Sequence, residues 1–436
     1  MGRIAYSFLY YLILPLILFR LVWRAKKAPA YRERWQERLG RLPKTACLRV
    51  WHHKASKGAR VVWVHAVSVG ETIAAVPLVR LMQKVHPDWL VVMTCMTPTG
   101  SERIGQIFGD TVVHVYAPYD TPGAVNGFLR VVQPDMLLIM ETELWPNMVH
   151  YTHQRQVPVI LVNGRMSERS ARGYQRLPWL IRPMMANMAR LLVQTEDHAK
   201  RFETLGACPR QVQVTGSIKF DLDVPASVHL EGKKLRRRLG ESRPVWIGAS
   251  THEGEDALLL GVHQRLLAIW PELCLILVPR HPERFEAVCR MVAQTGFTYQ
   301  RQSDVVSRSE SIGTSQVHVG DTMGQLMLLY AASDFAFVGG SLVQTGGHNP
   351  IEPAALGLPV LMGPHTFNFE EICQRLQSDG GLLQVPDEKA LEQALKGLLD
   401  HPAKATLMGR SALDFVERNR GALNLCLRAL ESELSG

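Results

Sequence analysis

Residues 61–72 of the chain read VVWVHAVSVGET. The run Val61–His65 is short, apolar and rich in β-branched residues, as is typical of a strand buried in a parallel sheet. A turn signal and a helix-length amphipathic segment follow it, and this alternation repeats along the chain. The repeats lie at Leu90–Thr94, Val112–Tyr116, Met136–Met140, Val157–Val162, Leu191–Gln194 and Val212–Thr215. The sequence therefore predicts a doubly wound α/β domain over residues 61–220.

A charged segment, residues 221–244, interrupts this alternation, and we interpret it as a linker that holds a short helix. The alternation resumes with runs at Val245–Ala249, Leu273–Val278, Val317–Val319, Phe335–Val338 and Pro359–Met362. These runs predict a second Rossmann-like domain over residues 245–436, so that two doubly wound domains face a cleft. Its last helix-like stretch, Ala403–Leu434, has no strand after it and could pack back across the domain junction.

The composition is that of an ordinary globular α/β enzyme. The 436 residues are 46% hydrophobic and 20% charged, which excludes a disordered chain, a collagen-like repeat and a polytopic membrane protein. The seven cysteines are scattered and form no C-x-x-C pair, which favours a reducing compartment over a disulfide framework.

The net charge of +9 comes from one end of the chain. Residues 1–60 carry 14 Lys and Arg side chains and two acids, whereas the other 376 residues carry 35 basic and 38 acidic side chains. A nucleic-acid enzyme would usually spread basic residues over its binding face, so nucleic acid is not an expected partner.

This basic segment begins with sixteen uncharged residues, Ile4–Phe19, and four basic residues follow between positions 20 and 27. A membrane span needs about twenty apolar residues, so a full crossing is borderline. No small-residue cleavage site follows, which predicts an uncleaved anchor with the body on the cytoplasmic face and a basic juxtamembrane segment near anionic lipids, together residues 1–60. A buried N-terminal helix with a solvated basic face remains the alternative.

Three candidate site residues follow the first predicted strand: Ser68, Gly70 and Glu71. Ligands of doubly wound sheets bind at such strand ends, and Gly70 would let a ligand approach the backbone closely. Glu71 is either a favourable acid in the first turn of a helix or, opposite an acceptor hydroxyl, a general base.

Further strand ends in this domain carry charged groups. Glu143 lies in ETELWP, residues 141–146, directly after Met136–Met140, where it could bind a polar ligand or help to cap the next helix. Arg165 and Lys219 follow later strands, at places where an anionic group would dock.

Strand ends of the second domain combine hydroxyls, glycines and cations. Either helix capping or an anion site explains each one alone, but three such loops in one domain favour a nucleotide-phosphate pocket. Asn349 would be the N-cap and Pro350 the first residue of a helix that holds Glu352 in its first turn. The other candidates are Ser250, Thr251, Pro279, Arg280, His281, Gly340 and Ser341.

Other nucleotide and metal chemistries lack their motifs. The chain has no Walker lysine loop and no G-x-G-x-x-G, so ATPase and dinucleotide oxidoreductase functions are weakly supported. It also has no H-E-x-x-H and no D-x-D, which leaves a metal site unsupported and fits a nucleoside-monophosphate leaving group.

These motifs together resemble one family, the 3-deoxy-D-manno-octulosonic acid (Kdo) transferases, which act on lipid A precursors in Gram-negative bacteria. The resemblance covers essentially the whole chain in order. It rests on the basic N-terminus, VVWVHAVSVGET, TPTGSER (97–103), METELWPN (140–147), VPRHPERF (278–285), GDTMG (320–324), GGHNPIE (346–352) and LMGPHTFNF (361–369).

The resemblance implies a GT-B fold and an inverting transferase that uses no metal or other cofactor. Its donor would be CMP-Kdo and its acceptor the bis-phosphorylated precursor lipid IVA at the inner membrane. Glu71 would be the catalytic base. The CMP-binding segments would be Pro279–Arg280, Met323-Gly324-Gln325 and Asn349-Pro350-Ile351-Glu352. Gln325 departs from the family, which often has Glu there, so a carboxylate role is in doubt at that position.

Two alternatives remain on the sequence alone. A nucleotide-sugar epimerase of the same fold would share the GGHNP loop but would need no membrane anchor. A membrane-tethered binding protein without turnover would not need a carboxylate at a strand end.

Overall fold

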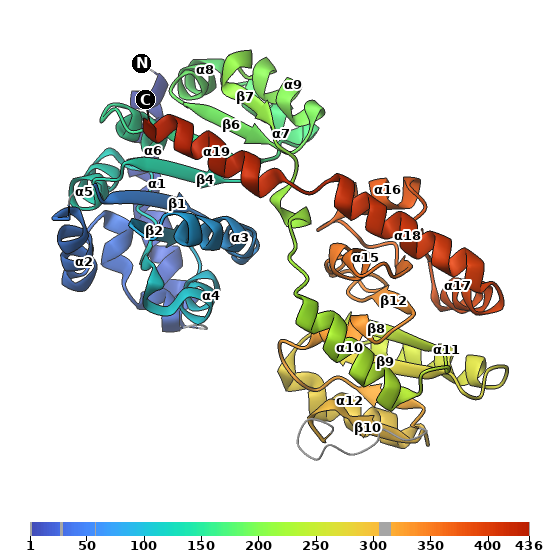
Figure 1. The fold of residues 1–436 in the computed structure, drawn as a ribbon. Coiled ribbons are helices and arrows are strands. Elements are labelled where there is room, and N and C mark those ends of the chain that lie inside the picture. Colours follow the sequence, from blue (N-terminus) through green and yellow to red (C-terminus); the bar gives the residue numbers. More distant parts are fainter. Residues whose placement is uncertain (1, 27–28, 57, 305–314, 436) are drawn as a thin grey trace. The chain divides into compact units, whose positions relative to one another are not determined.

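The computed structural model describes residues 2–26, 29–56, 58–304 and 315–435. The chain divides into two compact units, which are described separately (Figure 1). Unit 1 contains Met1–Asp221 together with Arg420–Gly436, and unit 2 contains Leu222–Asn419.

Unit 1 is built on a parallel seven-stranded sheet with the order β3-β2-β1-β4-β5-β6-β7. β1 pairs with β2 on one side, where Arg60 lies opposite Trp89, and with β4 on the other, where Val62 lies opposite Met136. The chain order therefore reverses between β1 and β4, and the carboxyl ends of these two strands form the switch point at which ligands bind in such sheets. The strands are β1 (Arg60–His65), β2 (Trp89–Cys95), β3 (Val113–Tyr116), β4 (Met136–Met140), β5 (Val159–Gly164), β6 (Arg190–Val193) and β7 (Val212–Val214).

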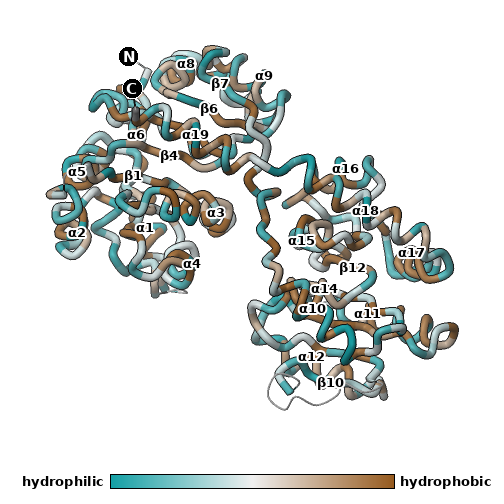
Figure 2. The backbone as a smooth tube through the Cα atoms, viewed as in Figure 1, coloured by the Kyte–Doolittle hydropathy of each residue, from teal (hydrophilic) through white to brown (hydrophobic). Residues whose placement is uncertain are grey.

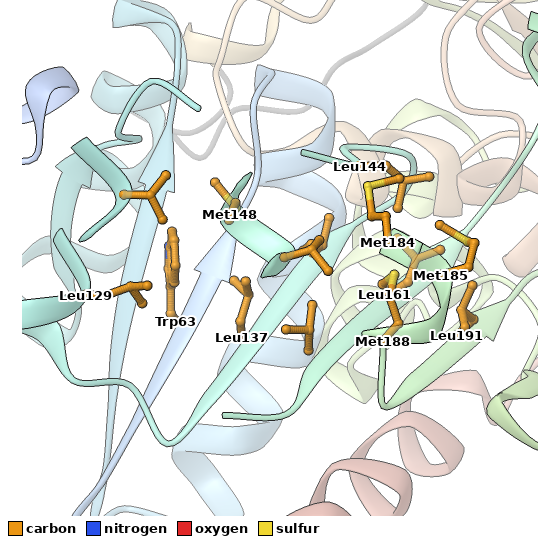
Figure 3. Packing of buried hydrophobic residues seen from close by; sticks show 14 of the residues in the cluster. Trp63, Leu129, Leu137, Leu144, Met148, Leu161, Met184, Met185, Met188 and Leu191 are labelled. Atoms are coloured by element: carbon orange, nitrogen blue, oxygen red, sulfur yellow. The ribbon is translucent and has the colours of Figure 1, made fainter. Parts of the chain in front are cut away.

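Apolar clusters cover both faces of this sheet because most residues of its central strands are apolar. β4 consists only of Met, Leu and Ile and is drawn in brown in Figure 2. On one face, Trp63 and its neighbours pack under α2, α5, α6, α8 and α9, and Figure 3 shows part of this cluster. On the other face, α3, α4 and α19 pack over Val62 and Val64.

The helices of unit 1 that follow the N-terminal segment are α3 (Val69–Val85), α4 (Pro98–Phe108), α5 (Pro122–Val132), α6 (Pro146–His153), α7 (Glu168–Gln175), α8 (Pro178–Ala186) and α9 (Glu196–Thr204). Short 3₁₀ turns are η3 (Gly109–Thr111), η4 (Pro209–Gln211) and η5 (Ile218–Phe220).

The N-terminal segment contains α1 (Gly2–Ala25), η1 (Pro29–Arg32), η2 (Trp35–Leu39) and α2 (Lys44–Lys54). α1 is long and apolar enough to cross a membrane, with a mean hydropathy of 1.8 over its best 18-residue window, only 6% of which is buried. The second half of the segment belongs to the fold, because Ala46 and Val50 of α2 lie in the core and Glu37 and Arg38 are buried. A boundary at residue 60 therefore does not separate an anchor from the domain.

Unit 2 also has a parallel seven-stranded sheet, with the order β10-β11-β9-β8-β12-β13-β14. Its switch point lies between β8 and β12. Its strands are β8 (Val245–Thr251), β9 (Cys274–Pro279), β10 (Tyr299–Arg301), β11 (Val317–Val319), β12 (Phe335–Val338), β13 (Val360–Met362) and β14 (Leu382–Gln384). The sequence prediction missed β10 and β14, the two edge strands, because they are partly exposed and form no continuous apolar run, unlike the equally short β11 and β13.

The helices of unit 2 are α10 (Ala226–Leu239), α11 (Glu255–Leu267), α12 (Phe285–Gln294), α14 (Leu326–Ala331), α15 (Ile351–Ala355), α16 (Glu370–Ser378), α17 (Glu388–Asp400) and α18 (Pro402–Arg418), with the turn η6 (Pro282–Arg284). The helix expected in the linker is present as α10, but it is part of the unit. Leu235 and Leu239 pack in the core, and a Cβ added at Gly232 would lie 2.5 Å from the Ala331 Cβ.

The C-terminal stretch was assigned to the second domain, 245–436, with the expectation that it could pack back across the domain junction, and its last part, from Arg420, does belong to unit 1. α18 ends at Arg418, Gly421 adopts a φ of +104° directly before α19 (Ala422–Ser435), and α19 then belongs to unit 1. The Asp221 carboxylate caps α19 by accepting from the backbone N–H groups of Gly421 at 2.6 Å and Leu423 at 2.7 Å. The apolar face of α19 packs beside α3, which the local sequence of the stretch does not reveal.

Candidate active site

Glu71 lies at the switch point of unit 1, in the first turn of α3. Ser68 is the N-cap of this helix, and its Oγ accepts from the Glu71 backbone N–H at 3.2 Å. The Glu71 carboxylate in turn accepts from the Ser68 hydroxyl and from the Val67 backbone N–H, both at 2.8 Å. Gly70 beside them is exposed, and an added Cβ there would meet only the Ser68 Oγ, at 3.8 Å. The structure thus confirms the capping role of Glu71 and leaves the backbone next to it open.

The environment of Glu71 is suited to a base that works near neutral pH. Burial raises the pKa of Glu71 to about 7, and the charges of Glu143 and Glu141 raise it further, whereas the hydrogen bonds from Ser68 and Val67 oppose this rise. A carboxylate with a pKa near the working pH is ionised in a substantial fraction of the molecules, and it is also basic enough to accept a proton from a substrate. Perturbed values of this kind are typical of functional sites.

The loop after β4 brings two more carboxylates to this place. Glu141 adopts a left-handed backbone conformation, with a φ of +53°, which is rare for residues other than glycine. Leu144 and Met148, on either side of the start of α6, are buried in the core, as Figure 3 shows, and they hold the loop in position. The Trp145 indole N–H donates to Glu143 at 3.0 Å. Burial raises the pKa of Glu143.

Arg165 and Lys219 both meet Glu141, which the sequence analysis did not select as a site residue. The Arg165 Nε lies 2.7 Å and the Lys219 Nζ 3.4 Å from the Glu141 carboxylate. Both cations were expected where an anionic ligand would dock, and the structure instead pairs them with an internal carboxylate. The position of Glu141 directly after a predicted buried strand was the sequence feature that could have identified it as a site residue.

In unit 2 the switch point is organised by a carboxylate that the sequence analysis did not select. Glu255, at the start of α11, is fully buried. It accepts from the backbone N–H groups of His252 at 2.9 Å, Gly340 at 2.7 Å, and Ser341 and Leu342 at 3.0 Å each. Gly340 and Ser341 were candidate substrate contacts, and their backbone N–H groups are already occupied by Glu255.

The hydroxyls expected at this end of the sheet also bond within the protein. The Ser341 hydroxyl donates to the Val338 carbonyl at 2.6 Å, and the Thr251 hydroxyl donates to Asp256 at 2.5 Å. Arg284 forms an ion pair with the same Asp256. Ser250 is buried with a φ of +57° and lies within β8, where the register against β9 shifts between Ala249 and Thr251.

Arg280 is the exposed cation of this region and follows Pro279, the last residue of β9. Its backbone N–H donates to the Thr251 carbonyl at 3.0 Å. The imidazoles of His252 and His348 stack beside it with Nε2 atoms 2.8 Å apart, and the His281 ring lies edge-on to His252 at 5.5 Å between centroids. Burial and then the Arg280 charge lower the pKa of His348 to about 4, which keeps this imidazole neutral at pH 7. A permanent cation beside the neutral His348 imidazole is suited to a phosphate group.

The GGHNPIE loop contributes Asn349 and Glu352 to this group. The Asn349 Oδ1 accepts from the Ile351 backbone N–H at 3.1 Å, and its Nδ2 donates to Glu352 at 3.2 Å. Burial raises the pKa of Glu352, and the Arg280 charge lowers it. The side chains of Pro350 and Ile351 are buried, and the helix, α15, begins at Ile351, one residue later than expected.

The third predicted segment precedes α14. Met323 is exposed, and Gly324 has a φ of +80° with open space at its Cβ position. The Gln325 side-chain oxygen Oε1 accepts from the Thr322 hydroxyl at 2.9 Å and from the Gln302 side-chain amide at 2.7 Å, so this side chain holds the turn. Over the described residues, no three His, Cys, Asp or Glu side chains are placed to hold a metal ion.

Two units with parallel α/β sheets of this kind also occur in solved structures of similar fold. The UDP-GlcNAc 2-epimerase from Neisseria meningitidis, solved with UDP-GlcNAc, superposes with a TM-score of 0.55 at 14% identity, over 86% of this chain and 100% of that chain. The protein is therefore of the GT-B-like class, with two Rossmann-like units.

Sequence comparison narrows this class to one family. A family model described as 3-deoxy-D-manno-octulosonic-acid transferase matches residues 33–222. A 3-deoxy-D-manno-octulosonic acid transferase from Haemophilus influenzae is 40% identical over 435 residues, which is 100% of this chain and 99% of the relative. The chain belongs to the 3-deoxy-D-manno-octulosonic acid (Kdo) transferase family.

It is accordingly a glycosyltransferase, and neither the epimerase nor the binding-protein alternative is retained. The solved C-terminal CMP-Kdo binding domain of WaaA from Acinetobacter baumannii is also similar to this chain. It is 32% identical and covers 43% of this chain and 97% of that chain, with a TM-score of 0.41.

Proposed function

We propose that this protein transfers Kdo from CMP-Kdo to lipid IVA at the cytoplasmic face of the inner membrane. The observation that carries the proposal is the Glu71 carboxylate, buried at the switch point of unit 1 with its pKa raised to about 7. Family membership supports the transferred sugar, and the resemblance in motifs supports the donor and the acceptor.

Glu71 acts in this reaction as the general base. Its carboxylate takes the proton of an acceptor hydroxyl while the hydroxyl oxygen forms a bond to the anomeric carbon of Kdo. The bond between that carbon and the CMP phosphate oxygen breaks with its electron pair, so CMP leaves as an anion. A single displacement of this kind inverts the anomeric centre.

Unit 2 supplies the groups for the departing CMP. Arg280 carries a permanent charge, and the side chains of His252, His281, His348 and Asn349 lie around it. Such groups stabilise the negative charge that develops on the phosphate, and the reaction then needs no metal ion.

The N-terminal helix supports a lipid acceptor. α1 exposes large apolar side chains, and residues 1–32 contain no acid. An exposed apolar surface next to basic side chains favours contact with anionic lipids.

The test is a transfer assay with full-length protein, CMP-Kdo generated in situ and lipid IVA, in the presence of EDTA, with products resolved by mass. Addition of one or more Kdo masses at a rate unaffected by EDTA is expected. The variant Glu71→Gln should lower kcat by about 10²- to 10⁴-fold and leave CMP affinity unchanged. The matched control is Glu203→Gln, which alters an exposed carboxylate on α9. The proposed mechanism is contradicted if Glu71→Gln retains more than one-tenth of the wild-type kcat. It is also contradicted if EDTA lowers the transfer rate and added divalent cations restore it.

A further inference from the structure

Side-chain exposure along α1 has the period of a helix that lies lengthwise on unit 1. One stripe is half-buried or buried, and the opposite stripe is 57–71% exposed. The covered stripe contains Arg3, Tyr6, Ser7, Tyr10, Leu14, Ile17, Leu21 and Ala25. The exposed stripe contains Ile4, Phe8, Leu12, Leu16, Phe19 and Trp23. Steps of three and four residues place each set on one face.

Polar contacts fasten the first turns of α1 to the body of unit 1. The Arg3 guanidinium donates to the Asn147 side-chain oxygen and to the Tyr151 hydroxyl, both at 3.0 Å. The Ser7 hydroxyl donates to the same Asn147 oxygen at 3.0 Å. These partners lie on α6, which begins directly after the carboxylate loop of the candidate site.

A second set of contacts continues this fastening. The Tyr6 hydroxyl donates to the Asp120 carboxylate at 3.0 Å, and the Gly123 backbone N–H donates to the Tyr11 hydroxyl at 3.1 Å. Asp120 is itself fixed, because it accepts from the backbone N–H groups of Asn147 and Met148 at the start of α6. The contacts of α1 therefore reach as far as its third turn.

The covered stripe continues beyond these contacts to the end of α1. Leu14, Ile17 and Leu21 are half-buried and Ala25 is buried, whereas the Arg24 guanidinium contacts only the next segment of the chain, 5.8 Å from the Tyr31 ring centroid. The residues after Tyr11 rise by about 1.5 Å each, which gives about 20 Å to the end of the helix. A hydrocarbon core is about 30 Å thick, so α1 cannot cross it while its first three turns stay fastened to unit 1 and its covered stripe stays against that unit.

We propose that α1 binds the membrane by lying in the plane of the interface, with its exposed stripe inserted and without crossing the bilayer. The partner is a lipid surface with anionic headgroups. The stripe is made of Ile, Leu, Phe and Trp, and the exposed cations Arg20, Arg24 and Lys26 adjoin it. That pattern is typical of interfacial helices. This inference rests on the proposed function, because a lipid-bound α1 would serve to bring the candidate site close to a lipid acceptor. Asn147 connects α1 to the loop that contains Glu143.

Topology is tested with full-length protein that carries one epitope tag before Met1 and another after Gly436. Protease is added to inverted inner-membrane vesicles and, separately, to intact spheroplasts. An in-plane helix leaves both tags digested in inverted vesicles and both protected in spheroplasts. Digestion of the N-terminal tag in spheroplasts, with the C-terminal tag protected, overturns the proposal in favour of a crossing helix.

The docking surface is tested by sedimentation of the purified chain with phosphatidylcholine vesicles that contain phosphatidylglycerol. The double variant F8E/F19E alters the exposed stripe and should lower the partition coefficient at least tenfold. The control Leu407→Glu changes an equally exposed apolar residue, on α18 of unit 2, and should leave it unchanged. Unchanged partition of the double variant, or a wild-type dimer that the double variant dissociates, overturns the lipid assignment.

An assay of Kdo transfer distinguishes a failure of this inference from a failure of the proposed function. The double variant should retain the wild-type rate on detergent-dispersed lipid IVA, because its altered residues touch no group of the candidate site. Vesicle binding by a wild-type protein that transfers no Kdo would leave the docking inference standing and contradict the proposed function.

Discussion

The Ser68 hydroxyl donates a hydrogen bond of 2.8 Å to the Glu71 carboxylate, and the same Ser68 oxygen accepts from the Glu71 backbone N–H at 3.2 Å. One pair of side chains therefore caps α3 and holds the proposed base. Two effects on the pKa of the Glu71 carboxylate oppose each other. The hydrogen bonds favour its ionised form, and burial favours its protonated form.

The first prediction concerns the pH dependence of transfer. A general base works only when ionised, and the pKa of Glu71 is raised to about 7. We expect kcat to rise with pH through about 7 and to level off above it, with a tenfold loss per pH unit well below 7. A profile of kcat from pH 5 to 9 measures this, and a midpoint near the ordinary value for Glu would contradict it.

The second prediction is that two substitutions shift this midpoint in opposite directions. Ser68→Ala removes a hydrogen bond to the ionised form and should move the midpoint to higher pH, whereas Glu143→Gln removes a nearby negative charge and should move it to lower pH. Loss of the N-cap in Ser68→Ala should also lower the free energy of unfolding by about 1 kcal/mol. Shifts of the same sign in both variants would contradict the assigned interactions.

The third prediction concerns CMP binding by unit 2. Arg280→Ala removes a charged hydrogen-bond donor that is worth about 1.5–3 kcal/mol, so the Kd for CMP should rise by about 10- to 100-fold. Isothermal titration calorimetry measures the effect. Arg290→Ala, which removes an exposed arginine of α12, is the control and should bind as the wild type does. Equal affinities for both variants would exclude Arg280 from the CMP site.

The fourth prediction concerns the Glu255 carboxylate, which accepts from four backbone N–H groups. A glutamine has one acceptor oxygen and turns an amide N–H₂ toward the remaining donors, so Glu255→Gln should lower the free energy of unfolding by about 3 kcal/mol or more. Chemical denaturation compares it with Glu253→Gln, an exposed neighbour that should be neutral. A loss below about 1 kcal/mol in Glu255→Gln would show that the loop does not depend on this carboxylate.

The fifth prediction concerns the return of α19 to unit 1. Asp221→Ala removes the acceptor for the first amides of α19 and should destabilise the helix by about 1–2 kcal/mol. Hydrogen exchange of residues 422–435 should become correspondingly faster. Asp223→Ala, at an exposed position on the chain that follows, is the control and should leave the exchange rates unchanged.

The candidate site was predictable where its residues follow strands. Glu71, Glu143, Arg280 and Asn349 each lie a few residues after an apolar run, and parallel strands bring their carboxyl ends to one edge of a sheet. Glu141 and Glu255 were not selected, because nothing in their local sequence tells an internal partner from a ligand contact.

By itself, the sequence determined the strands of both sheets except the two short edges, the capping of α3 at Ser68 and the apolar character of α1. These features depend on side chains a few residues apart, whose periodicity and turn chemistry are local. Only the tertiary structure decided that Glu255 occupies the amides of Gly340 and Ser341, and that Glu141 pairs with Arg165 and Lys219. It alone also decided that α19 packs on α3 and that the first turns of α1 are fastened to α6 and Asp120. The physical reason is that most of these contacts join residues tens to hundreds of positions apart, which become neighbours only when the sheets and their covering helices assemble.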